Sequence, residues 1–392
     1  MGAKKILILS HKPPYPKNDG GCVAIAQVLE RLTSIGHEVT LLTMETHKHP
    51  SPVNKHQNQL TYKSVFVDTR IRPMGALRNL FTSESYILSR FHQSAFDEAL
   101  KDMLKSNTFD DVIFESLFTS SYYKTVLKFS KAKLMYRSHN IEHQIWENKS
   151  RFSSNPLTKT YLKLQAKRLK REEINFWNSI PKIASISNHD SKEITKHTKA
   201  KIETLPLYAD EQLIMQKEQV AKVDFFHLGA MDWTPNQQAI EWLLNEVWPS
   251  LKEKEARAEF HLAGRGMTEK LAKRIQEGLY NHGEVSDALG FISDHKVMLV
   301  PLFVGSGIRV KIIEGMAMAK CIITTTKGAQ GISCTHMENM LIANTKEEFI
   351  EMMSFCLHNP DEVDRMGENA RHYVRENFSQ EKVEQQLNTL LA

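Results

Sequence analysis

The amino-acid sequence predicts an α/β protein made of two doubly wound, Rossmann-like domains, each with a parallel sheet. Short apolar strands alternate with amphipathic helices in both halves of the chain, which is typical of parallel sheets covered on both faces. The length of 392 residues is too great for one ordinary core. With 41% hydrophobic and 25% charged residues, the composition is that of a folded protein. We therefore expect two domains, each with its own sheet.

The first half contains a clear strand–helix–strand unit. The apolar run in residues 4–9 is typical of a buried strand, and apolar residues at helical spacing predict a helix over 22–35. Gly36 ends that helix, and EVTLLT forms the next strand. Another helix is expected over residues 86–105. The remaining strands expected in this half are SVFVD, DDVIFE, AKLMYR and KIASIS.

The second half repeats the alternation from Val223 onward. We expect helices from Pro235 and over residues 309–319, and the strands DFFHLG, EFHLAG, VMLVPLF and CIITTT. A polar, proline-containing connection at TLPLYADEQ separates the halves. The predicted domains are therefore an N-terminal one over 1–207 and a C-terminal one over 208–379. The last helix, over 380–392, is expected to pack back onto the first domain.

Cysteine usage and apolar runs exclude several protein classes. The four cysteines are scattered without a CxxC pair, so neither a disulfide framework nor a zinc site is predicted. His47 and His49 lie in a polar stretch and are interpreted as solvated residues, so no metal site is expected. The N-terminal apolar run is too short for a signal peptide, and no stretch approaches ~18 apolar residues. We expect a cytoplasmic protein with reduced cysteines.

The formal net charge of +5 is modest, but basic residues concentrate in residues 155–172. One interpretation of that stretch is a solvated helix face. The other is a surface that contacts acidic lipid headgroups at the inner face of the plasma membrane. Nucleic-acid binding is not predicted, because the stretch lacks interleaved aromatic residues and no reader motif occurs.

A glycine pair precedes the first helix. Gly20 and Gly21 follow PPYPKND, between the first strand and that helix. Adjacent glycines at a helix start let backbone N–H groups approach an anion, which the helix dipole also favours. The GxGxxG spacing of dinucleotide-binding enzymes is absent. The alternative is an ordinary surface turn.

A second glycine-rich segment follows the strand VMLVPLF. It runs GSGIRVKIIE, and if a helix begins near Gly307, then Gly307, Lys311 and Glu314 share one face. A helix start with Arg309 and Lys311 nearby suits a diphosphate, and Glu314 can accept hydrogen bonds from ribose hydroxyls. The alternative is a surface Lys–Glu pair worth only a few tenths of a kcal/mol.

Two further motifs lie at the ends of predicted strands. His139 lies in YRSHNIE, where its ring could bind a sugar hydroxyl or move a proton. Gly229 opens GAMDWTPNQ after the first strand of the second half. Thr234 and Gln237 there predict a capping box, which explains a helix start without any function.

Taken together, these motifs resemble the retaining glycosyltransferases of the GT-B fold, the large family that includes sucrose synthase and bacterial mannosyl- and glucosyltransferases. The resemblance covers nearly the whole chain. It is strongest at KILILS…PPYPKNDGG, YRSHNIE, FFHLGAMDWTPNQQAI and PLFVGSGIRVKIIEGMAMAK. It implies two Rossmann-like domains that face a central cleft, of which the N-terminal one binds the acceptor and the C-terminal one binds the nucleotide-sugar substrate. It also implies no cofactor and no metal.

The resemblance also implies roles for individual residues. The diphosphate would be contacted by Gly20 and Gly21 across the cleft, and the donor sugar by His139. Arg309 and Lys311 would stabilise the departing diphosphate. The implied catalytic residues are His139, Arg309 and Lys311, and the implied donor-binding residues are Gly20, Gly21, Gly229, Ile292, Ser306, Gly307 and Glu314.

The E-x7-E motif that is typical of the family is only partly present. Glu314 matches its second glutamate, which holds the ribose, whereas Ser306 replaces the first. Ile292 lies where backbone atoms meet the base. The Arg and Lys that commonly follow the first strand of the second domain are also missing, and that loop carries Met231 and Asn236 instead.

The expected function is transfer of a sugar from a UDP- or GDP-sugar to an acceptor hydroxyl with retention, in polysaccharide or surface-glycan biosynthesis. The acceptor would be a glycan, a lipid-linked molecule or a small molecule. One alternative is a nucleotide-sugar 2-epimerase, which needs no acceptor. The other is a non-catalytic nucleotide-sugar-binding protein, suggested by the missing glutamate.

Overall fold

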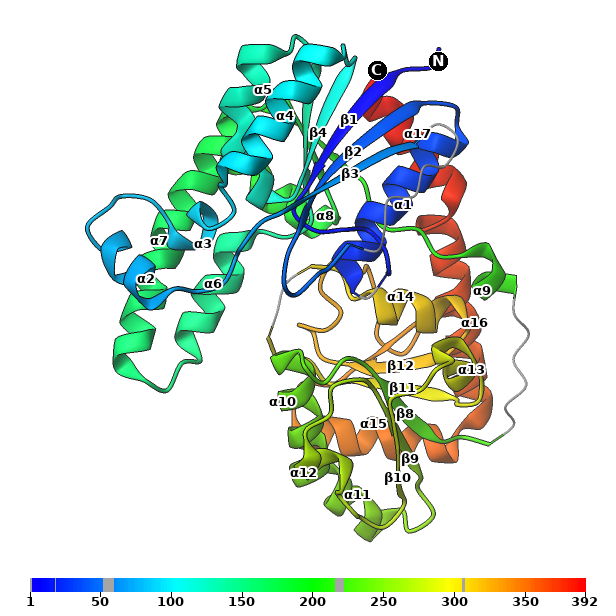
Figure 1. The fold of residues 1–392 in the computed structure, drawn as a ribbon. Helices are drawn as coiled ribbons and strands as arrows, with labels where there is room; N and C mark the ends of the chain where they lie inside the picture. The colour runs from blue at the N-terminus through cyan, green and yellow to red at the C-terminus, as the bar shows by residue number, and fades with distance from the viewer. Residues whose placement is uncertain (1, 18, 52–59, 216–221, 305–306) are drawn as a thin grey trace. The chain divides into compact units, whose positions relative to one another are not determined.

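The computed structural model describes residues 2–17, 19–51, 60–215, 222–304 and 307–392. The chain forms two compact units (Figure 1): unit 1 comprises Met1–Leu207 with Val383–Ala392, and unit 2 comprises Tyr208–Lys382. Both units are parallel sheets covered by helices. The predicted α/β class with two Rossmann-like, doubly wound domains is confirmed.

Unit 1 is built on a seven-stranded parallel sheet in the order β3-β2-β1-β4-β5-β6-β7. The strands are β1 (Lys5–Ser10), β2 (Glu38–Glu45), β3 (Leu60–Phe66), β4 (Asp111–Glu115), β5 (Lys133–Ser138), β6 (Lys182–Ser185) and β7 (Lys201–Thr204). The helices are α1 (Gly20–Ser34), α2 (Pro73–Asn79), α3 (Tyr86–Ser89), α4 (Ser94–Ser106), the 3-10 helix η1 (Leu117–Tyr122), α5 (Tyr123–Phe129), α6 (Glu142–Arg151), α7 (Pro156–Ser179), α8 (Asn188–Thr195) and most of α17 (Gln380–Leu391).

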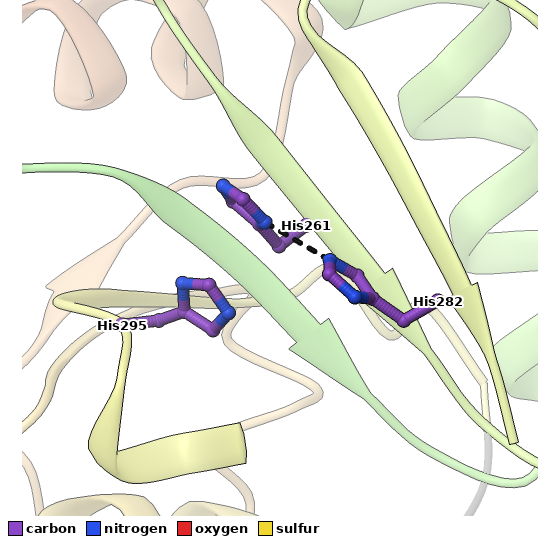
Figure 2. A group of neighbouring side chains, drawn as sticks. All are labelled: His261, His282 and His295. Atoms are coloured by element: carbon purple, nitrogen blue, oxygen red, sulfur yellow. Dashed lines mark hydrogen bonds between the residues drawn. The ribbon is translucent and has the colours of Figure 1, made fainter. Parts of the chain in front are cut away.

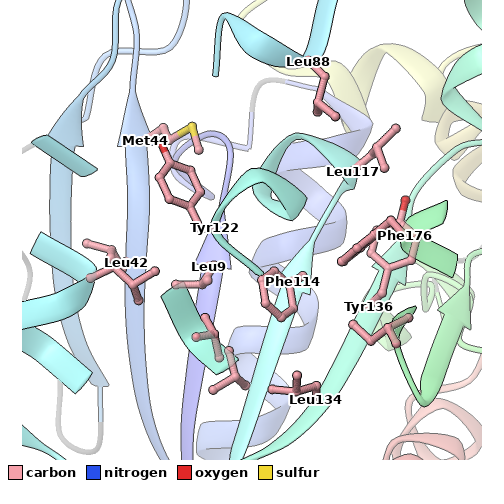
Figure 3. Packing of buried hydrophobic residues seen from close by; sticks show 14 of the residues in the cluster. Leu9, Leu42, Met44, Leu88, Phe114, Leu117, Tyr122, Leu134, Tyr136 and Phe176 are labelled. Carbon is pink, nitrogen blue, oxygen red and sulfur yellow. The ribbon is translucent and has the colours of Figure 1, made fainter. Parts of the chain in front are cut away.

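The core of unit 1 explains why its strands are continuous apolar runs. Central strands are buried on both faces, so both sets of alternating side chains lack water contact. On one face, Phe114 and Tyr136 pack edge-on against Phe176 of α7, with ring centroids 5.7 and 5.1 Å away (Figure 3). Full burial of one such side chain stabilises the fold by about 1.5–3 kcal/mol.

One expected helix of unit 1 is interrupted. The helix expected over residues 86–105 is two helices, α3 and α4, because the chain between them bonds elsewhere. The hydroxyl of Tyr122 donates to the Phe91 carbonyl at 2.7 Å and accepts from the Gln93 amide at 2.9 Å. These tertiary hydrogen bonds replace helical ones, and the period of apolar residues alone does not reveal them.

Unit 2 is built on a six-stranded parallel sheet in the order β10-β9-β8-β11-β12-β13. The strands are β8 (Phe225–Leu228), β9 (Phe260–Ala263), β10 (Leu279–Gly283), β11 (Val297–Val300), β12 (Cys321–Thr324) and β13 (Leu341–Ile342). The helices are α9 (Glu211–Met215), α10 (Thr234–Trp242), the π-helix η2 (Leu243–Val247), α11 (Trp248–Lys254), α12 (Glu269–Ala272), α13 (Ala288–Ser293), α14 (Val310–Ala317), α15 (Lys346–His358) and α16 (Pro360–Asn377).

The predicted capping box of α10 is wrong. The residue before the helix is Trp233, whereas Thr234 already lies in its first turn. The backbone carbonyl of Trp233 accepts from the amides of Asn236 and Gln237 at 3.0 and 3.2 Å. The helix therefore begins at Thr234 without a side-chain cap.

Among the described residues, no helix combines the length and the apolar character that crossing a membrane requires.

Candidate functional site

The strand order of unit 2 reverses between β8 and β11. In open parallel sheets, ligands bind outside the carboxyl ends of the strands at such a point. Gly229 directly follows β8, and residues 301–309 connect β11 to α14. The predicted donor-binding residues of the second half therefore lie at the edge of the sheet where a ligand is expected.

Lys311 reaches back from α14 to the loop after β8. Its Nζ donates to Asn236 Oδ1 at 3.0 Å and lies 3.3 Å from His227 Nε2. A Cβ on Gly229 would lie 2.5 Å from the same Nζ and 2.8 Å from Asn236 Nδ2. The absence of a side chain at Gly229 thus makes room for the ammonium group.

The imidazole ring of His227 is neutral and orients the Lys311 side chain. Its Nδ1–H donates to the Leu299 carbonyl at 2.7 Å, so Nε2 carries the lone pair that faces Lys311. Burial and the charge of Lys311 lower the pKa of His227 well below its ordinary value. Because His227 and Asn236 both offer acceptors to Lys311, they hold its ammonium at the carboxyl end of β8.

Two cations lie close together at the start of α14. Arg309 is buried, and its guanidinium lies 5.5 Å from the ring centre of Trp233. Burial and the charge of Arg309 lower the pKa of Lys311 to about 7. Burial raises the pKa of Glu314, one turn into the helix, although Lys311 opposes the shift. Such crowded, partly desolvated cations favour a polyanionic ligand.

The helix begins later than predicted. It starts at Val310 rather than near Gly307, and Arg309 is the extended residue before it. Gly307 has φ +77, a left-handed conformation that suits glycine and does not continue a helix. Gly307 therefore does not share a helix face with Lys311 and Glu314. The predicted residue Ser306 lies outside the described residues.

The Ile292 side chain is buried in the core of unit 2, at 1% exposure. Its carbonyl accepts from the His295 amide at 3.3 Å. Only the backbone of Ile292 is thus suited to the predicted contact with a base.

In unit 1, His139 follows β5 and belongs to a buried ionic network. Its Nε2–H donates to Glu115, which also lies 3.3 Å from the Arg137 guanidinium. Arg137 in turn donates to the Ala24 carbonyl at 2.8 Å, which ties β5 to α1. Burial opposes ionisation of Glu115, but Arg137 and His139 lower its pKa. Because Glu115 fixes Nε2–H, the free acceptor of a neutral His139 is Nδ1.

Gly20 and Gly21 start α1 as expected, but a carboxylate already occupies that helix end. Asp19 accepts from the Cys22 amide at 2.9 Å and from Lys12 Nζ at 2.6 Å. A Cβ on Gly21 would lie 2.5 Å from that Nζ. An anion bound here would share Lys12 with Asp19. Lys12 could have been recognised in the sequence as a candidate anion-binding residue, because it follows the first strand.

His49 is not simply solvated, which corrects the sequence interpretation. Its Nε2 lies 3.2 Å from Asp19 Oδ2, and the residue is half-buried, whereas His47 is exposed. Burial opposes the shift, but His49 and Lys12 lower the pKa of Asp19 far below its ordinary value.

Sequence reasoning also missed a carboxyl group in YRSHNIE. Burial and the charge of Glu173 raise the pKa of Glu142 to about 8, so its side chain is mostly protonated at pH 7. Glu173 reaches from α7 to accept from the Glu142 and His143 amides at 2.9 and 3.0 Å. Only the tertiary structure brings these carboxyl groups together, so the motif itself gave no signal.

Residues 222–359 match the family described as glycosyl transferases group 1. A curated relative is 25% identical over 398 residues and is described as an uncharacterized 44.6 kDa protein in the cps region of Klebsiella pneumoniae. The alignment covers 97% of this chain and 97% of that protein.

Solved structures show the same fold. Sucrose-phosphate synthase from Thermosynechococcus elongatus gives a TM-score of 0.74 at 14% identity, covering 99% of this chain and 98% of that one. The Anabaena protein HepE, solved with UDP-glucose, gives 0.66 at 12% identity and covers 99% of each chain. Residues 222–359 are therefore a group 1 glycosyltransferase domain, in a chain with the two-domain GT-B fold.

Proposed function

We propose that this protein transfers a glycosyl group from a UDP- or GDP-sugar to an acceptor hydroxyl with retention at the anomeric carbon. The observation that carries the proposal is the pair Arg309 and Lys311 at the start of α14, next to the bare backbone of Gly229. The group 1 domain and the similarity to HepE, which was solved with UDP-glucose, support it.

The reaction breaks the bond between the anomeric carbon and a diphosphate oxygen. A bond from that carbon to the acceptor oxygen forms on the same face, and the acceptor proton passes to the departing diphosphate oxygen. Arg309 and Lys311 stabilise the negative charge that develops on the diphosphate. The protein contributes mainly by positioning the reactants and stabilising the leaving group.

The other predicted residues bind the donor around this pair. Glu314 accepts hydrogen bonds from the ribose hydroxyls, and the backbone of Ile292 meets the base. Gly307 lets the chain approach the donor, and Ser306 contributes to donor binding in place of the family's first glutamate. These roles follow from the family resemblance and from the position of α14 after β11.

Unit 1 supplies His139 and the glycine pair. His139 accepts a hydrogen bond from a sugar hydroxyl through Nδ1, since Glu115 holds the other ring nitrogen. Gly20 and Gly21 contact the diphosphate through their backbone amides, with Lys12 nearby.

The relative from a cps region supports a role in polysaccharide or surface-glycan biosynthesis. The acceptor is then a glycan, a lipid-linked molecule or a small molecule with a free hydroxyl.

A basic and apolar surface on unit 1 supports contact with an anionic membrane. Exposed cations recur every four residues along α7, and this basic stripe consists of Lys159, Lys163, Lys167 and Arg171. Leu157 and Phe152 at the turn between α6 and α7 are 83% and 67% exposed. The segment after α2 is fixed to α7, since Arg168 donates to the Asn79 carbonyl at 2.8 Å, and it exposes Phe81. Cations beside exposed apolar side chains favour anionic lipid.

A donor panel tests the proposed function. The purified protein is incubated with UDP-, GDP-, ADP- and dTDP-sugars in EDTA, while released nucleoside diphosphate and thermal stability are measured. We expect one donor to stabilise the protein and to release its nucleoside diphosphate slowly. If a donor stabilises the protein but no nucleoside diphosphate is released with any acceptor tried, a non-catalytic binding protein is favoured. If no donor changes either quantity, the proposed donor site is refuted.

The fate of the sugar separates transferase from 2-epimerase. A transferase gives free sugar of unchanged configuration, or a glycoside with the donor's anomeric configuration, whereas an epimerase inverts the second carbon. Proton NMR of the released sugar distinguishes these products.

A further inference from the structure

Three histidines gather on one face of the unit 2 sheet. They are His261 in β9, His282 in β10 and His295 before β11 (Figure 2). Asp224 and His295 precede β8 and β11, whereas Gly229 follows β8 at the other end. Asp224 and His295 therefore lie at the opposite end of the sheet from Gly229, although the His295 amide donates to the carbonyl of Ile292.

The nitrogen atoms of the cluster have the spacing of ligands to one ion. One potential ligand atom from each ring lies within 4.8 Å of the other two. His261 Nδ1 and His282 Nε2 are 3.0 Å apart. Two nitrogens bound tetrahedrally to one ion at 2.0–2.1 Å are separated by roughly 3.3 Å. Small rotations of the side chains would bring all three rings onto one ion.

Asp224 is placed as the residue that orients the ligands. Its Oδ2 accepts from His295 Nδ1–H at 2.5 Å, which leaves His295 Nε2 as a lone-pair donor. The same oxygen lies 3.8 Å from His261 Nε2. When His261 Nδ1 donates its lone pair to an ion, the ring proton moves to Nε2 and faces this carboxylate. Carboxylates bonded to the far nitrogen are the usual partners of metal-bound histidines.

We propose that His261, His282 and His295 bind a divalent transition-metal ion of the Zn²⁺ class, with Asp224 holding two of the rings. Imidazole nitrogens suit Zn²⁺, Co²⁺, Ni²⁺ and Cu²⁺, and three protein ligands leave one position for water. His282 is exposed, so an ion can enter from solvent.

The bound ion would act as a clamp on the sheet. β10 is its edge strand, paired only with β9 among the described strands of unit 2. An ion held by His282, His261 and His295 would tie this edge to β9 and to the segment before β11. Because such an ion would join three segments of unit 2, we expect metal to raise the stability of the protein.

A second group of ligand atoms, Asp19, Cys22 and His49, is a weaker choice. Lys12 already forms an ion pair with Asp19 at 2.6 Å, so a metal ion there would have to displace a cation.

Metal titration of the untagged, EDTA-dialysed full chain tests the proposal. Zn²⁺ is added in a calorimeter, and Co²⁺ is added while its visible absorption reports the coordination geometry. We expect one saturable Zn²⁺ per chain, intense tetrahedral Co²⁺ bands and a higher melting temperature. Asp224→Asn should weaken Zn²⁺ binding by roughly 10–100-fold.

His282→Asn removes a ligand from an exposed edge position, so it should weaken binding at least as much without unfolding the protein. His189→Asn, at an exposed histidine of α8, is the control and should bind as the wild type does. No saturable binding by the wild type, or equal affinity of the wild type and His282→Asn, would overturn the proposal.

Discussion

Lys311 lies in surroundings that penalise its positive charge, since it is buried and close to Arg309. Lys311 has two neutral acceptors, Asn236 and His227, but the positive charge of Arg309 lies close by. The ring of Trp233 also lies against Arg309 and adds cation–π attraction to it. A diphosphate would relieve the repulsion between the two cations and would therefore be bound strongly.

The pH dependence of diphosphate binding follows from Lys311. Its pKa of about 7 in the free protein lies below the ordinary 10.5, so about half of the Lys311 side chains are charged at pH 7 and this fraction falls as pH rises. We expect the affinity for UDP or GDP to fall as pH rises from 7 to 9, by at most about tenfold per pH unit. The affinity stops falling once the pH exceeds the pKa of Lys311 in the complex, which the bound diphosphate raises.

Calorimetric titration of the nucleoside diphosphate at several pH values measures this effect. Lys311→Met is the control, because it has no ammonium to lose and should bind weakly at every pH. An affinity of the wild type that is constant from pH 7 to 9 would contradict the assignment of Lys311.

At the scale of elements, Gly229 and Gly264 follow adjacent strands but lie against different groups. A Cβ on Gly229 meets the ends of the Lys311 and Asn236 side chains, which can move. A Cβ on Gly264 would lie 1.8 Å from the Gly229 carbonyl oxygen, which belongs to the backbone. The first glycine therefore makes room for a functional group, and the second lets two strand ends approach each other.

Substitution by alanine should separate these roles. Gly264→Ala is expected to lower the free energy of unfolding by about 1–3 kcal/mol, as overpacked sites do. Gly229→Ala should displace Lys311 and weaken diphosphate binding while changing stability less. Urea unfolding and calorimetry of both variants test this, with Gly2→Ala, which meets nothing within 4 Å, as control. The same loss of stability in both variants would contradict the distinction.

The sequence predicted the strands with continuous apolar runs, because burial on both faces leaves a clear pattern. It missed β10, whose LYNHG has no such run, because this edge strand is only partly buried. It also placed the start of α14 too early, since helical periodicity does not reveal the left-handed Gly307.

The residues of the candidate site were easier to predict than their partners. Gly229, Arg309, Lys311 and Glu314 follow strands in motifs that resemble a known family. The partners of Lys311 and His139, which are His227 and Glu115, lie within buried strands that look purely structural. Pairing between distant segments determines such contacts, so one sequence alone could not show them.

At the scale of the whole molecule, the chain ends on the unit in which it began. Arg31 of α1 forms an ion pair with Glu384, and Lys182 Nζ donates to the Leu390 carbonyl at 2.7 Å. The apolar face of α17 is fully covered and consists of Val383, Leu387, Leu390 and Leu391.

Deletion of residues 380–392 should therefore destabilise unit 1 in particular. Each Val or Leu of unit 1 that the deletion exposes lowers the free energy of unfolding by about 1.5–3 kcal/mol. This is a large share of the stability of a typical domain. Limited proteolysis with mass spectrometry should find new cleavage in unit 1 before unit 2. Equal resistance of the truncated and full-length chains would show that α17 is dispensable.

The membrane contact proposed above involves the exposed surface of α6 and α7. Replacing Lys159, Lys163 and Lys167 of the basic stripe by Gln removes about 1 kcal/mol of attraction per cation near the membrane. Co-sedimentation with vesicles rich in phosphatidylglycerol should fall more than about tenfold. The control replaces three exposed lysines of unit 2 by Gln: Lys254, Lys270 and Lys273. Failure of the wild type to bind these vesicles would exclude the membrane surface.

The central claim is that Arg309 and Lys311 bind the diphosphate of a nucleotide sugar. It is tested most directly by calorimetric titration of the wild type, Arg309→Ala and Lys311→Met with UDP and uridine, and with GDP and guanosine. We expect each variant to lose about 1.5–3 kcal/mol of binding energy for the preferred diphosphate and to bind its nucleoside as the wild type does. Wild-type affinity for the diphosphate in both variants, or a wild type that binds neither diphosphate better than its nucleoside, would contradict the claim.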